Sequence, residues 1–345
     1  MQTEAMVLDQ HGGPEVLTKK TIDLGPLGPR EVRVRVRAVA MNHMDLWVRR
    51  GGPAFKLQYP HRLGCDISGE IDEIGPGVTS LAKGDRVFVQ PGLSCGTCRM
   101  CLAGQDNLCR SYKLLGENVS GGYSRFIHIP DVNAVKIGPD LGWIDAAAAP
   151  LCTLTAWQMV FAKAQVKAGQ TVVVHAAGSG VSTVVIQLCK MLGARVIATT
   201  TDPAKVMPAR EIGADEVILT SQDDYGAQIK KLTNREGPAA IFDHVGGELM
   251  EKAVTAVARG GRIVTCGATG GFTAKIDLRH VFFRQVELLG STMGSKSMLL
   301  DALPFLQSGA LRPVIDRTMS LWDAAKAHEL LEGRKVFGKL VLLVD

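Results

Sequence analysis

Four cysteines gathered in one short stretch are the sequence's strongest chemical signal. The segment "CGTCRMCLAGQDNLC" places Cys95, Cys98, Cys101 and Cys109 at spacings of three, three and eight residues. Thiolates spaced in this way can converge on one ion and fill all four positions of a tetrahedral zinc site, which leaves no position for a substrate. The spacing therefore predicts a structural zinc; free thiols or an iron–sulfur cluster are the alternatives.

A second signal is the small-residue turn in "VVVHAAGSGVSTVVIQLCKMLGA", which has the order strand, turn, helix. Backbone N–H groups at the start of such a helix can face a pyrophosphate, because Ala176, Gly178 and Gly180 add no bulk there. Ser179 and Ser182 stand where glycine is more usual, and the alternative is a tight turn without a ligand. We expect a dinucleotide site, with Gly178, Ser179, Gly180 and Val181 at the cofactor.

The next strand, "RVIATTTDP", bears on the cofactor's phosphate. Its predicted last residue is Thr200, which is neutral, and Lys205 and Arg210 follow closely. A neutral strand end with nearby cations admits a 2′-phosphate, whereas an acid there binds the 2′-hydroxyl of NAD. We therefore expect NADP(H) to be preferred over NAD(H). Asp202 would favour NAD if the strand ran two residues further.

The elements that must position these groups follow two different patterns. Up to about residue 130, short alternating strands such as "EVRVRVRAVA" and "DRVFVQ" are cut by glycine-rich turns, which predicts a β-rich, partly open barrel. After the Ala-rich helical stretch "WIDAAAAPLCTLTAWQMVFAKAQ", buried-type strands alternate with helices, which predicts a doubly wound parallel sheet. The predicted class is α/β, with domains at 1–150 plus 297–345 and at 151–296.

Composition excludes several functional classes. The chain has 345 residues, a net charge of +5 and 46% hydrophobic residues, enough for two cores. Arg33, Arg35 and Arg37 alternate with valines, so they form the solvated face of a strand rather than a nucleic-acid arm. No apolar run approaches the length of a membrane span and the first residues do not resemble a signal peptide, so we expect a cytoplasmic protein.

Together these features resemble the medium-chain dehydrogenase/reductase superfamily over essentially the whole chain. The motifs that carry the resemblance are "MNHMDLWVRRGG", "GCDISGEIDEIGPGV", "KGDRV", the four-cysteine lobe, "GGYSRF", "HAAGSGV", "CGATGG" and "FGKLVL". The resemblance implies a GroES-like catalytic domain, completed by the end of the chain, around a Rossmann domain. It also implies cofactor contacts by Thr155 under the nicotinamide, by Lys339 at the pyrophosphate, and by Val245, Cys266 and Gly267.

The centre departs from the zinc alcohol dehydrogenase branch of this superfamily. That branch binds a catalytic zinc through a cysteine, a His–Glu pair and a second cysteine; here Asn42, Cys65 with Asp66, and Cys152 fall at those positions. Met44 falls where the branch has a proton-relaying Ser or Thr. By contrast, Asn42–x–x–Asp45 with Arg49, and Gly64–x–Asp66, look like the zinc-free quinone oxidoreductases and enoyl reductases.

We therefore expect an NADPH-dependent reductase of an activated C=C bond or a quinone, acting on a small enone, enoyl or quinone substrate. Asn42 is the predicted hydrogen-bond donor to the substrate carbonyl or the nicotinamide; its alternative role is a turn residue that satisfies backbone groups. The segments of His43, Tyr112 and Tyr123 lie nearest as proton sources, but water serves equally well and no donor is assigned. A homodimer or homotetramer is expected, paired through the edge strand in "VELLGSTM".

Two other functions remain open on sequence alone. In the first, Cys65 and Cys152, with Asp66 or His43, retain a catalytic zinc, and the protein is an NADP-dependent alcohol dehydrogenase or carbonyl reductase. In the second, the altered centre is inactive and the chain is a nucleotide-binding redox sensor. His175 and His244 are expected to be packing and hydrogen-bonding residues near the cofactor rather than catalytic bases.

Overall fold

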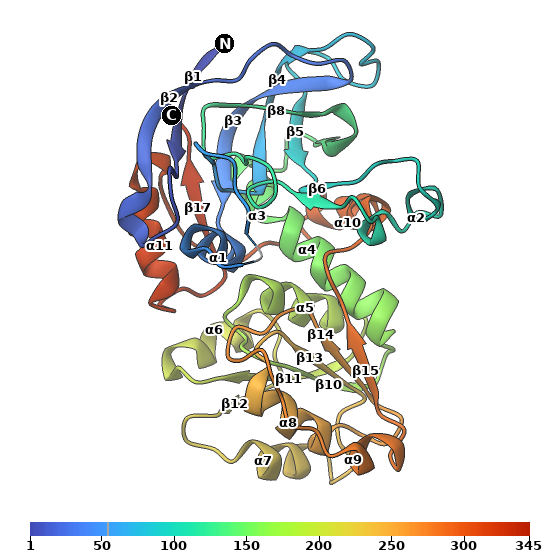
Figure 1. The fold of residues 1–345 in the computed structure, drawn as a ribbon. Helices are drawn as coiled ribbons and strands as arrows, with labels where there is room; N and C mark the ends of the chain where they lie inside the picture. Colours follow the sequence, from blue (N-terminus) through green and yellow to red (C-terminus); the bar gives the residue numbers. More distant parts are fainter. Residues whose placement is uncertain (54) are drawn as a thin grey trace. The chain divides into compact units, whose positions relative to one another are not determined.

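The chain folds into two compact units, shown in a computed structural model that describes residues 1–53 and 55–345 (Figure 1). Unit 1 combines Met1–Cys152 with Ser295–Asp345, and unit 2 is the intervening segment Thr153–Gly294. Each boundary lies two residues from the predicted one, at 152 against 150 and at 295 against 297. The end of the chain thus returns to the unit that contains its beginning.

Unit 1 is built mainly from strands. The strands are β1 (Gln2–Val7), β2 (Thr18–Asp23), β3 (Glu31–Ala40), β4 (Asp66–Ile74), β5 (Arg86–Val89), β6 (Gly92–Leu93), β7 (Lys113–Leu114), β8 (Phe126–Pro130), β9 (Ala134–Lys136), β16 (Ile315–Ser320) and β17 (Lys339–Leu343). The helices are α1 (His43–Arg50), α2 (Arg99–Leu102), α3 (Trp143–Ala148), α4 (Pro150–Trp157), α10 (Lys296–Gln307) and α11 (Ala324–Glu332), with short helices η1 (Pro14–Val16), η2 (Asp106–Leu108), η3 (Asp131–Asn133) and η6 (Leu321–Asp323); α4 runs across the boundary between the units.

The main sheet of unit 1 has seven strands in the order β16-β17-β3-β4-β5-β9, with β8 paired to β3 (Figure 1). The alternation in β3 explains its place, because Val32, Val34 and Val36 are buried in the core while the arginines between them lie on the other face. Two of those arginines, Arg33 and Arg35, pair with Asp72 of β4. The basic face is thus neutralised by its own sheet.

The last strand decides where the chain ends. β17 pairs antiparallel with β3, with Val341 opposite Ala40, and pairs parallel with β16. Its residues Leu340, Val341 and Leu342 are buried, as expected for a strand inside a sheet. The amino end of β17 therefore lies alongside the carboxyl end of β3, beside the start of α1.

Unit 2 alternates strands with helices. The strands are β10 (Thr171–Val174), β11 (Arg195–Thr200), β12 (Glu216–Leu219), β13 (Ala240–Asp243), β14 (Arg262–Thr265) and β15 (Glu287–Gly290); the helices are α5 (Gly180–Met191), α6 (Val206–Glu211), α7 (Tyr225–Leu232), α8 (Gly247–Ala256) and α9 (Leu278–Phe282), with short segments η4 (Gln158–Ala164) and η5 (Pro203–Lys205).

All six strands of unit 2 are parallel and follow the order β12-β11-β10-β13-β14-β15 (Figure 1). The order reverses between β10 and β13, and ligands of doubly wound sheets bind at the carboxyl ends of the strands at such a reversal. The valines of β10 and the apolar residues of β13 are fully buried, as strands covered on both faces require.

Within the described part of the chain, no helix is long and apolar enough to cross a membrane.

Candidate active site and metal-binding lobe

The four predicted zinc ligands come together at one point of unit 1. Their sulfur atoms all lie within 4.8 Å of one another. The Sγ–Sγ distance is 3.5 Å for Cys98–Cys101, 3.6 Å for Cys95–Cys109 and 3.9 Å for Cys95–Cys101. Zinc–sulfur bonds of about 2.3 Å at tetrahedral angles would place the sulfurs about 3.8 Å apart, so the group fits a four-coordinate zinc.

The lobe that carries these cysteines has little apolar packing of its own. Its helices α2 and η2 are one turn or less, and Leu102 and Leu108 are exposed. One tie to the rest of unit 1 is Asp106, whose Oδ1 accepts the Lys296 N–H at 2.9 Å where α10 begins. A segment of this kind needs another source of stability, and a bound zinc provides it.

The predicted dinucleotide turn leads directly into the start of α5. Ala176 adopts a positive φ of 48°, and Ser179 is the N-cap of α5, with its Oγ accepting the Ser182 N–H at 3.1 Å. α5 begins at Gly180, so Val181 lies in its first turn, where backbone N–H groups have no partner inside the helix. Of the serines that replace glycine, Ser179 thus caps the helix, and Ser182 Oγ donates to the His175 carbonyl at 2.7 Å.

The two histidines near this turn are hydrogen-bonded to neighbouring side chains. His244 Nε2 lies 2.8 Å from Ser179 Oγ. His175 Nδ1 lies 2.8 Å from Asp243 Oδ1, and its Nε2 lies 3.0 Å from Tyr225 Oη. Burial lowers the pKa of His244, so its ring is neutral at physiological pH. Both histidines fix the loops at the strand ends.

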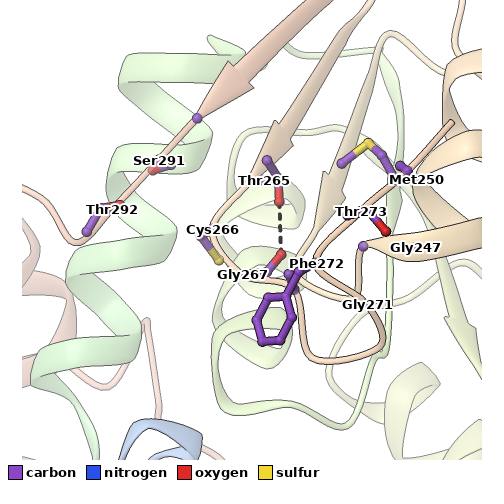
Figure 2. Close-up of a pocket in the computed structure, with 14 residues that line it drawn as sticks. Gly247, Met250, Thr265, Cys266, Gly267, Gly271, Phe272, Thr273, Ser291 and Thr292 are labelled. Carbon is purple, nitrogen blue, oxygen red and sulfur yellow. Dashed lines mark hydrogen bonds between the residues drawn. The ribbon is translucent and has the colours of Figure 1, made fainter. Parts of the chain in front are cut away.

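A cavity of about 440 Å³ opens at the carboxyl ends of β14 and β15 (Figure 2). It includes the predicted cofactor residues Cys266 and Gly267, and Thr265 Oγ1 donates to the Gly267 carbonyl at 3.1 Å. A Cβ at Gly246, where φ is +72°, would lie 2.4 Å from the Gly271 carbonyl oxygen, so only glycine fits. The remaining predicted cofactor residues of unit 2, Thr155, Gly178, Ser179, Gly180, Val181, Thr200, Lys205 and Val245, do not line this cavity.

The end of β11 is where the sequence predicted it. β11 ends at Thr200, which is buried and whose Oγ1 accepts the Asp202 N–H at 3.1 Å. Asp202 caps η5 by accepting the Ala204 N–H at 2.9 Å. Arg210, expected to be a nearby cation for the phosphate, instead contacts Glu216 and the Asp215 carbonyl.

The residues predicted for the catalytic centre converge within unit 1. Asn42 precedes α1, Cys65 and Asp66 stand at the start of β4, and Cys152 lies in α4. The Asn42 amide nitrogen Nδ2 donates to Asp66 Oδ2 at 2.9 Å and to Cys65 Sγ at 3.3 Å. Cys152 Sγ lies 3.8 Å from Asn42 Oδ1. All four side chains are buried.

Asn42 does not have the free amide that its predicted role requires. Both amide hydrogens are used, one by Cys65 and one by Asp66, so neither is left for a substrate carbonyl. The alternative role, a side chain that satisfies turn backbone, describes it in part, because Asn42 is the N-cap of α1 and forms a capping box with Asp45. Asn42 also holds Cys65 and Asp66 in place.

Lys339 is also placed differently from the prediction. Its ammonium Nζ donates to Asn42 Oδ1 at 2.6 Å and forms an ion pair with Asp66 Oδ2 at 3.0 Å, and the side chain is only 4% exposed. The charge of Lys339 is therefore paired with Asp66 inside unit 1. This corrects the expectation that Lys339 contacts the pyrophosphate. The expectation failed because the position of β17 beside β3 points this side chain into the cluster.

The charges in this cluster depend on burial. Burial, aided by the negative charge of Asp66, holds the pKa of the Cys65 thiol well above its ordinary value, and burial also raises the pKa of Cys152. Burial by itself would lower the pKa of Lys339, but Cys152, Asp66 and Cys65 outweigh it and the pKa rises. Near neutral pH the cluster therefore contains two thiols and an ammonium group.

The expected ligands of a catalytic zinc do not form a ligand set. Across the described residues, the four-cysteine lobe is the group of three or more His, Cys, Asp or Glu side chains close enough to hold a metal. At the centre, Asp66 instead accepts from Asn42 and Lys339 on Oδ2 and from the Leu151 N–H on Oδ1 at 2.7 Å. With Lys339 and Asn42 bound to Asp66, the donor set does not fit the metal.

Asp45 and Gly64 hold the two segments that carry the cluster. Asp45 in α1 is fully buried, and its carboxylate accepts the Asn42 N–H at 2.7 Å and the Gly64 N–H at 2.9 Å. Gly64 has φ of +87°, and a Cβ there would lie 2.5 Å from the ring of Tyr123. These contacts fix the turn that leads into Cys65.

The tyrosines considered as proton sources are not exposed acids. Tyr123 is fully buried and its hydroxyl lies 3.2 Å from His328 Nε2. Burial raises the pKa of both Tyr123 and Tyr112. Deprotonation of either phenol is therefore unfavourable near neutral pH, so neither tyrosine is a good proton source.

Known proteins resemble this chain over its whole length. Residues 28–139 match the alcohol dehydrogenase GroES-like domain, and residues 180–308 match the zinc-binding dehydrogenase domain. The chain is 30% identical to an NAD-dependent alcohol dehydrogenase of Saccharolobus solfataricus, over 92% of this chain and 93% of that protein. It is 29% identical to a quinone oxidoreductase of Pseudomonas aeruginosa, with 96% and 97% covered.

A solved structure described as an NAD-dependent alcohol dehydrogenase matches with a TM-score of 0.96 and 46% identity, over 99% of this chain and all of that one. The chain belongs to the medium-chain dehydrogenase/reductase superfamily. It is therefore an oxidoreductase of a family that uses a pyridine nucleotide, with a GroES-like and a Rossmann domain, and not the non-catalytic sensor that the sequence left open.

Sequence reasoning missed several residues at these sites. The place of Lys339 in the cluster could not be read from a strand whose partner was unknown. Ser291 and Thr292, which line the cavity after β15, were missed because the motif at that strand end is weak. Their position after a predicted strand could have identified Ser291 and Thr292, because residues that follow parallel strands meet at one edge of the sheet.

Proposed function

We propose that this medium-chain dehydrogenase/reductase reduces an activated C=C bond or a quinone, in an enone, enoyl or quinone substrate, with NADPH and without a catalytic metal. The observation that carries the proposal is the engagement of Asp66 by Asn42 and Lys339. Asn42 and Asp66 stand at positions that resemble the metal site of the alcohol dehydrogenase branch, but here they bind each other and Lys339.

The chemistry needs little from the protein beyond positioning and charge. When bound, a dihydronicotinamide would supply a hydride and be oxidised by two electrons. A C=C substrate would take the hydride at its β-carbon and a proton from water at its α-carbon, whereas a quinone would take the hydride and a proton and become the hydroquinone. The residues of unit 1 hold the substrate and exclude bulk water, which strengthens the field of the Lys339 ammonium.

The preference for NADPH rests on the end of β11. Thr200 is neutral, and the carboxylate of Asp202 is already used to cap η5, which leaves Lys205 as the cation beside the strand end. An acid that bonded both ribose hydroxyls would favour NAD instead. The same unit contributes Gly178, Ser179, Gly180 and Val181 at the pyrophosphate. Nearer the nicotinamide it contributes Thr155, Val245, Cys266 and Gly267.

The four-cysteine lobe holds one structural zinc in this proposal. Cys95, Cys98, Cys101 and Cys109 supply all four ligands, so the ion has no open position and takes no part in the reaction. Its function is to stabilise the lobe against α10.

We also propose that the chain assembles as a homodimer, or as a homotetramer, through β15. β15 is the edge of the six-stranded sheet, so its outer N–H and C=O groups are available for pairing. Leu288 on this strand is 43% exposed, and Phe282 and Phe283 at the end of the adjacent α9 are also exposed. An apolar edge strand of this kind is suited to a second copy of itself.

The alternative is an alcohol dehydrogenase or carbonyl reductase with a catalytic zinc. It is favoured by the similarity to proteins named alcohol dehydrogenase. It requires Lys339 to leave Asp66 so that Asp66 or His43 can join Cys65 and Cys152 around the metal.

Two measurements on the purified protein separate these functions. Zinc content and turnover are measured together, with NADPH plus 2-enones, quinones and aldehydes, and with NADP+ plus simple alcohols. We expect close to one zinc per chain, the zinc of the lobe, and reduction of enones or quinones without oxidation of alcohols. Two zincs per chain together with alcohol oxidation would instead establish the alternative.

A further inference from the structure

Unit 1 buries an ion pair at the candidate centre. Asp66 is fully buried and Lys339 is 4% exposed. Of the three groups that donate to the Asp66 carboxylate, the Asn42 amide and the Leu151 N–H are neutral. The ammonium of Lys339 is therefore the donor that balances the charge of Asp66. A buried carboxylate without such a partner is strongly unfavourable.

The surroundings of the Lys339 nitrogen are those of a small cation. Nζ lies 2.6 Å from Asn42 Oδ1 and 3.0 Å from Asp66 Oδ2, and the sulfur of Cys152 lies 3.8 Å from the same Asn42 oxygen. Zinc binds oxygen and sulfur at about 2.0–2.3 Å. Shifts of less than about 1 Å would therefore bring the two oxygens onto an ion at the same point, with the Cys152 sulfur as the neighbouring donor. Cys65, held by Asn42 at 3.3 Å, lies at the edge of the group.

We propose that the Lys339 ammonium is the resident cation of this site: it occupies the point where a divalent metal would bind, balances the charge of Asp66, and so keeps the site metal-free. Divalent metals are excluded because they would have to displace a cation that is covalently part of β17. The proposal extends the proposed function, since both describe a metal-free centre, but it concerns metal binding and stability rather than the substrate.

The test removes the charge of Lys339 and measures zinc content and Tm. Lys339→Met keeps the apolar stem but leaves Asp66 without a counter-ion. We expect this variant to have a lower Tm than wild type and, after equilibration with zinc, to bind about one more zinc per chain and to recover part of the lost Tm. Lys339→Arg retains the charge and should bind no additional zinc.

Three further variants test whether the charge of Asp66 and the sulfur of Cys152 cause the changes in Tm and zinc content. Lys339→Met with Asp66→Asn removes both charges, so it should be more stable than Lys339→Met alone and should bind no additional zinc. Lys339→Met with Cys152→Ala should lose the additional zinc while the lobe keeps its own. Lys335→Met changes an exposed lysine four residues away and should behave as wild type.

The proposal is overturned if Lys339→Met binds no more zinc than wild type, or if the double variant with Asp66→Asn is no more stable than the single one. If Lys339→Met does not fold without metal, recovery of soluble, folded protein with zinc or with Asp66→Asn supports the proposal, and its absence in both cases refutes it. None of these measurements depends on the substrate, so failure of the proposed function would be seen separately in the wild-type turnover panel.

Discussion

At the scale of single residues, the candidate centre is a group of buried polar side chains that satisfy one another. Asn42 both donates and accepts within the group, and Asp66 accepts three hydrogen bonds. Such a network is stable only while every member keeps its partner, because an unpaired polar group in a buried site costs free energy. Substitutions here therefore affect stability as well as turnover.

Asp45 gives this region a predictable dependence on pH. Burial raises its pKa from the ordinary value of 3.8 to about 6; the N–H groups of Asn42 and Gly64 and the charge of Lys339 act in the opposite direction, and Asp66 raises it further. Asp45 therefore holds its proton more tightly in the native state than in the unfolded state. The resulting contribution to the free energy of unfolding is fully present below about pH 4 and is lost as the pH rises through about 6.

Denaturant unfolding of wild type and Asp45→Asn at pH 4.5 and pH 7.5 measures this effect. A shift of about two pKa units corresponds to about 3 kcal/mol in all, of which about 2 kcal/mol falls between pH 4.5 and pH 6, so wild type should lose about 2 kcal/mol relative to Asp45→Asn between the two values. Asp140→Asn, which removes an exposed carboxylate, is the control and should follow wild type. If the free energies of unfolding of wild type and Asp45→Asn changed equally between pH 4.5 and pH 7.5, Asp45 would be ionised at both values and its pKa would not be raised.

At the scale of elements, the cluster depends on where four segments end or begin. β3 leads through Asn42 into α1, β4 begins at Asp66, α4 contributes Cys152, and β17 begins at Lys339. The pairing of β17 with β3 in an antiparallel register brings Lys339 to the same edge of the sheet as Asn42 and Asp66. The cluster is thus a product of sheet register.

The zinc lobe should depend on its metal rather than on packing. Cys101→Ser removes one of four ligands, so we expect loss of the lobe zinc, a lower Tm, and faster proteolysis between residues 95 and 112. Zinc analysis, thermal unfolding and mapping of the cleavage sites provide the three measurements. Cys189→Ser is the matched control: Cys189 is a buried thiol in α5, so its variant should keep the zinc whatever its stability.

The end of β11 should set the cofactor preference. Thr200→Asp places an acid at the strand end, where it would repel a 2′-phosphate and accept from a ribose hydroxyl. We expect kcat/KM with NADPH to fall about tenfold or more, equivalent to about 1.4 kcal/mol, while kcat/KM with NADH rises.

Because Thr200 is buried, a second variant tests the same element without placing a charge inside the protein. Lys205→Ala should reduce kcat/KM with NADPH and leave that with NADH nearly unchanged. Lys230→Ala, on the exposed face of α7, should change neither. A wild type that prefers NADH, or a Lys205→Ala variant that keeps the wild-type kcat/KM with NADPH, would contradict the preference.

At the scale of the whole molecule, each unit has its own hydrophobic core and its own sheet with edge strands. The core of unit 1 forms around the β3–β4 region and the core of unit 2 around the parallel sheet. β15 leaves one edge of that sheet open, and its exposed Leu288 is the residue that an assembly would cover. The association of chains should therefore depend on unit 2.

Leu288→Arg should weaken this association. A charged side chain on an edge strand prevents strands from pairing edge to edge. Light scattering after size exclusion should give a smaller mass for Leu288→Arg than for wild type. Leu300→Arg is the matched control, since it puts the same charge on an exposed leucine of α10 in unit 1 and should leave the mass unchanged. A dimer of normal mass with Leu288→Arg would place the contact elsewhere.

The sequence by itself determined the features that are local. Alternation of Val32, Val34 and Val36 with arginines predicted a strand with one buried face, and strand–helix alternation predicted the parallel sheet. The end of β11 at Thr200 and the convergence of the four lobe cysteines also followed from short-range patterns. These predictions succeed because periodicity, turn residues and ligand spacing act over a few residues at a time.

Only the tertiary structure decided what lies at the centre. Lys339 is separated from Asn42 by 297 residues and from Asp66 by 273, and nothing in the local pattern of "GKLVLLVD" indicates that its strand pairs with β3. The sequence therefore left open whether Cys65, Asp66 and Cys152 hold a metal, and it placed Lys339 at the cofactor. The fold decides because a buried carboxylate requires a cation, and strand pairing determines which cation reaches it.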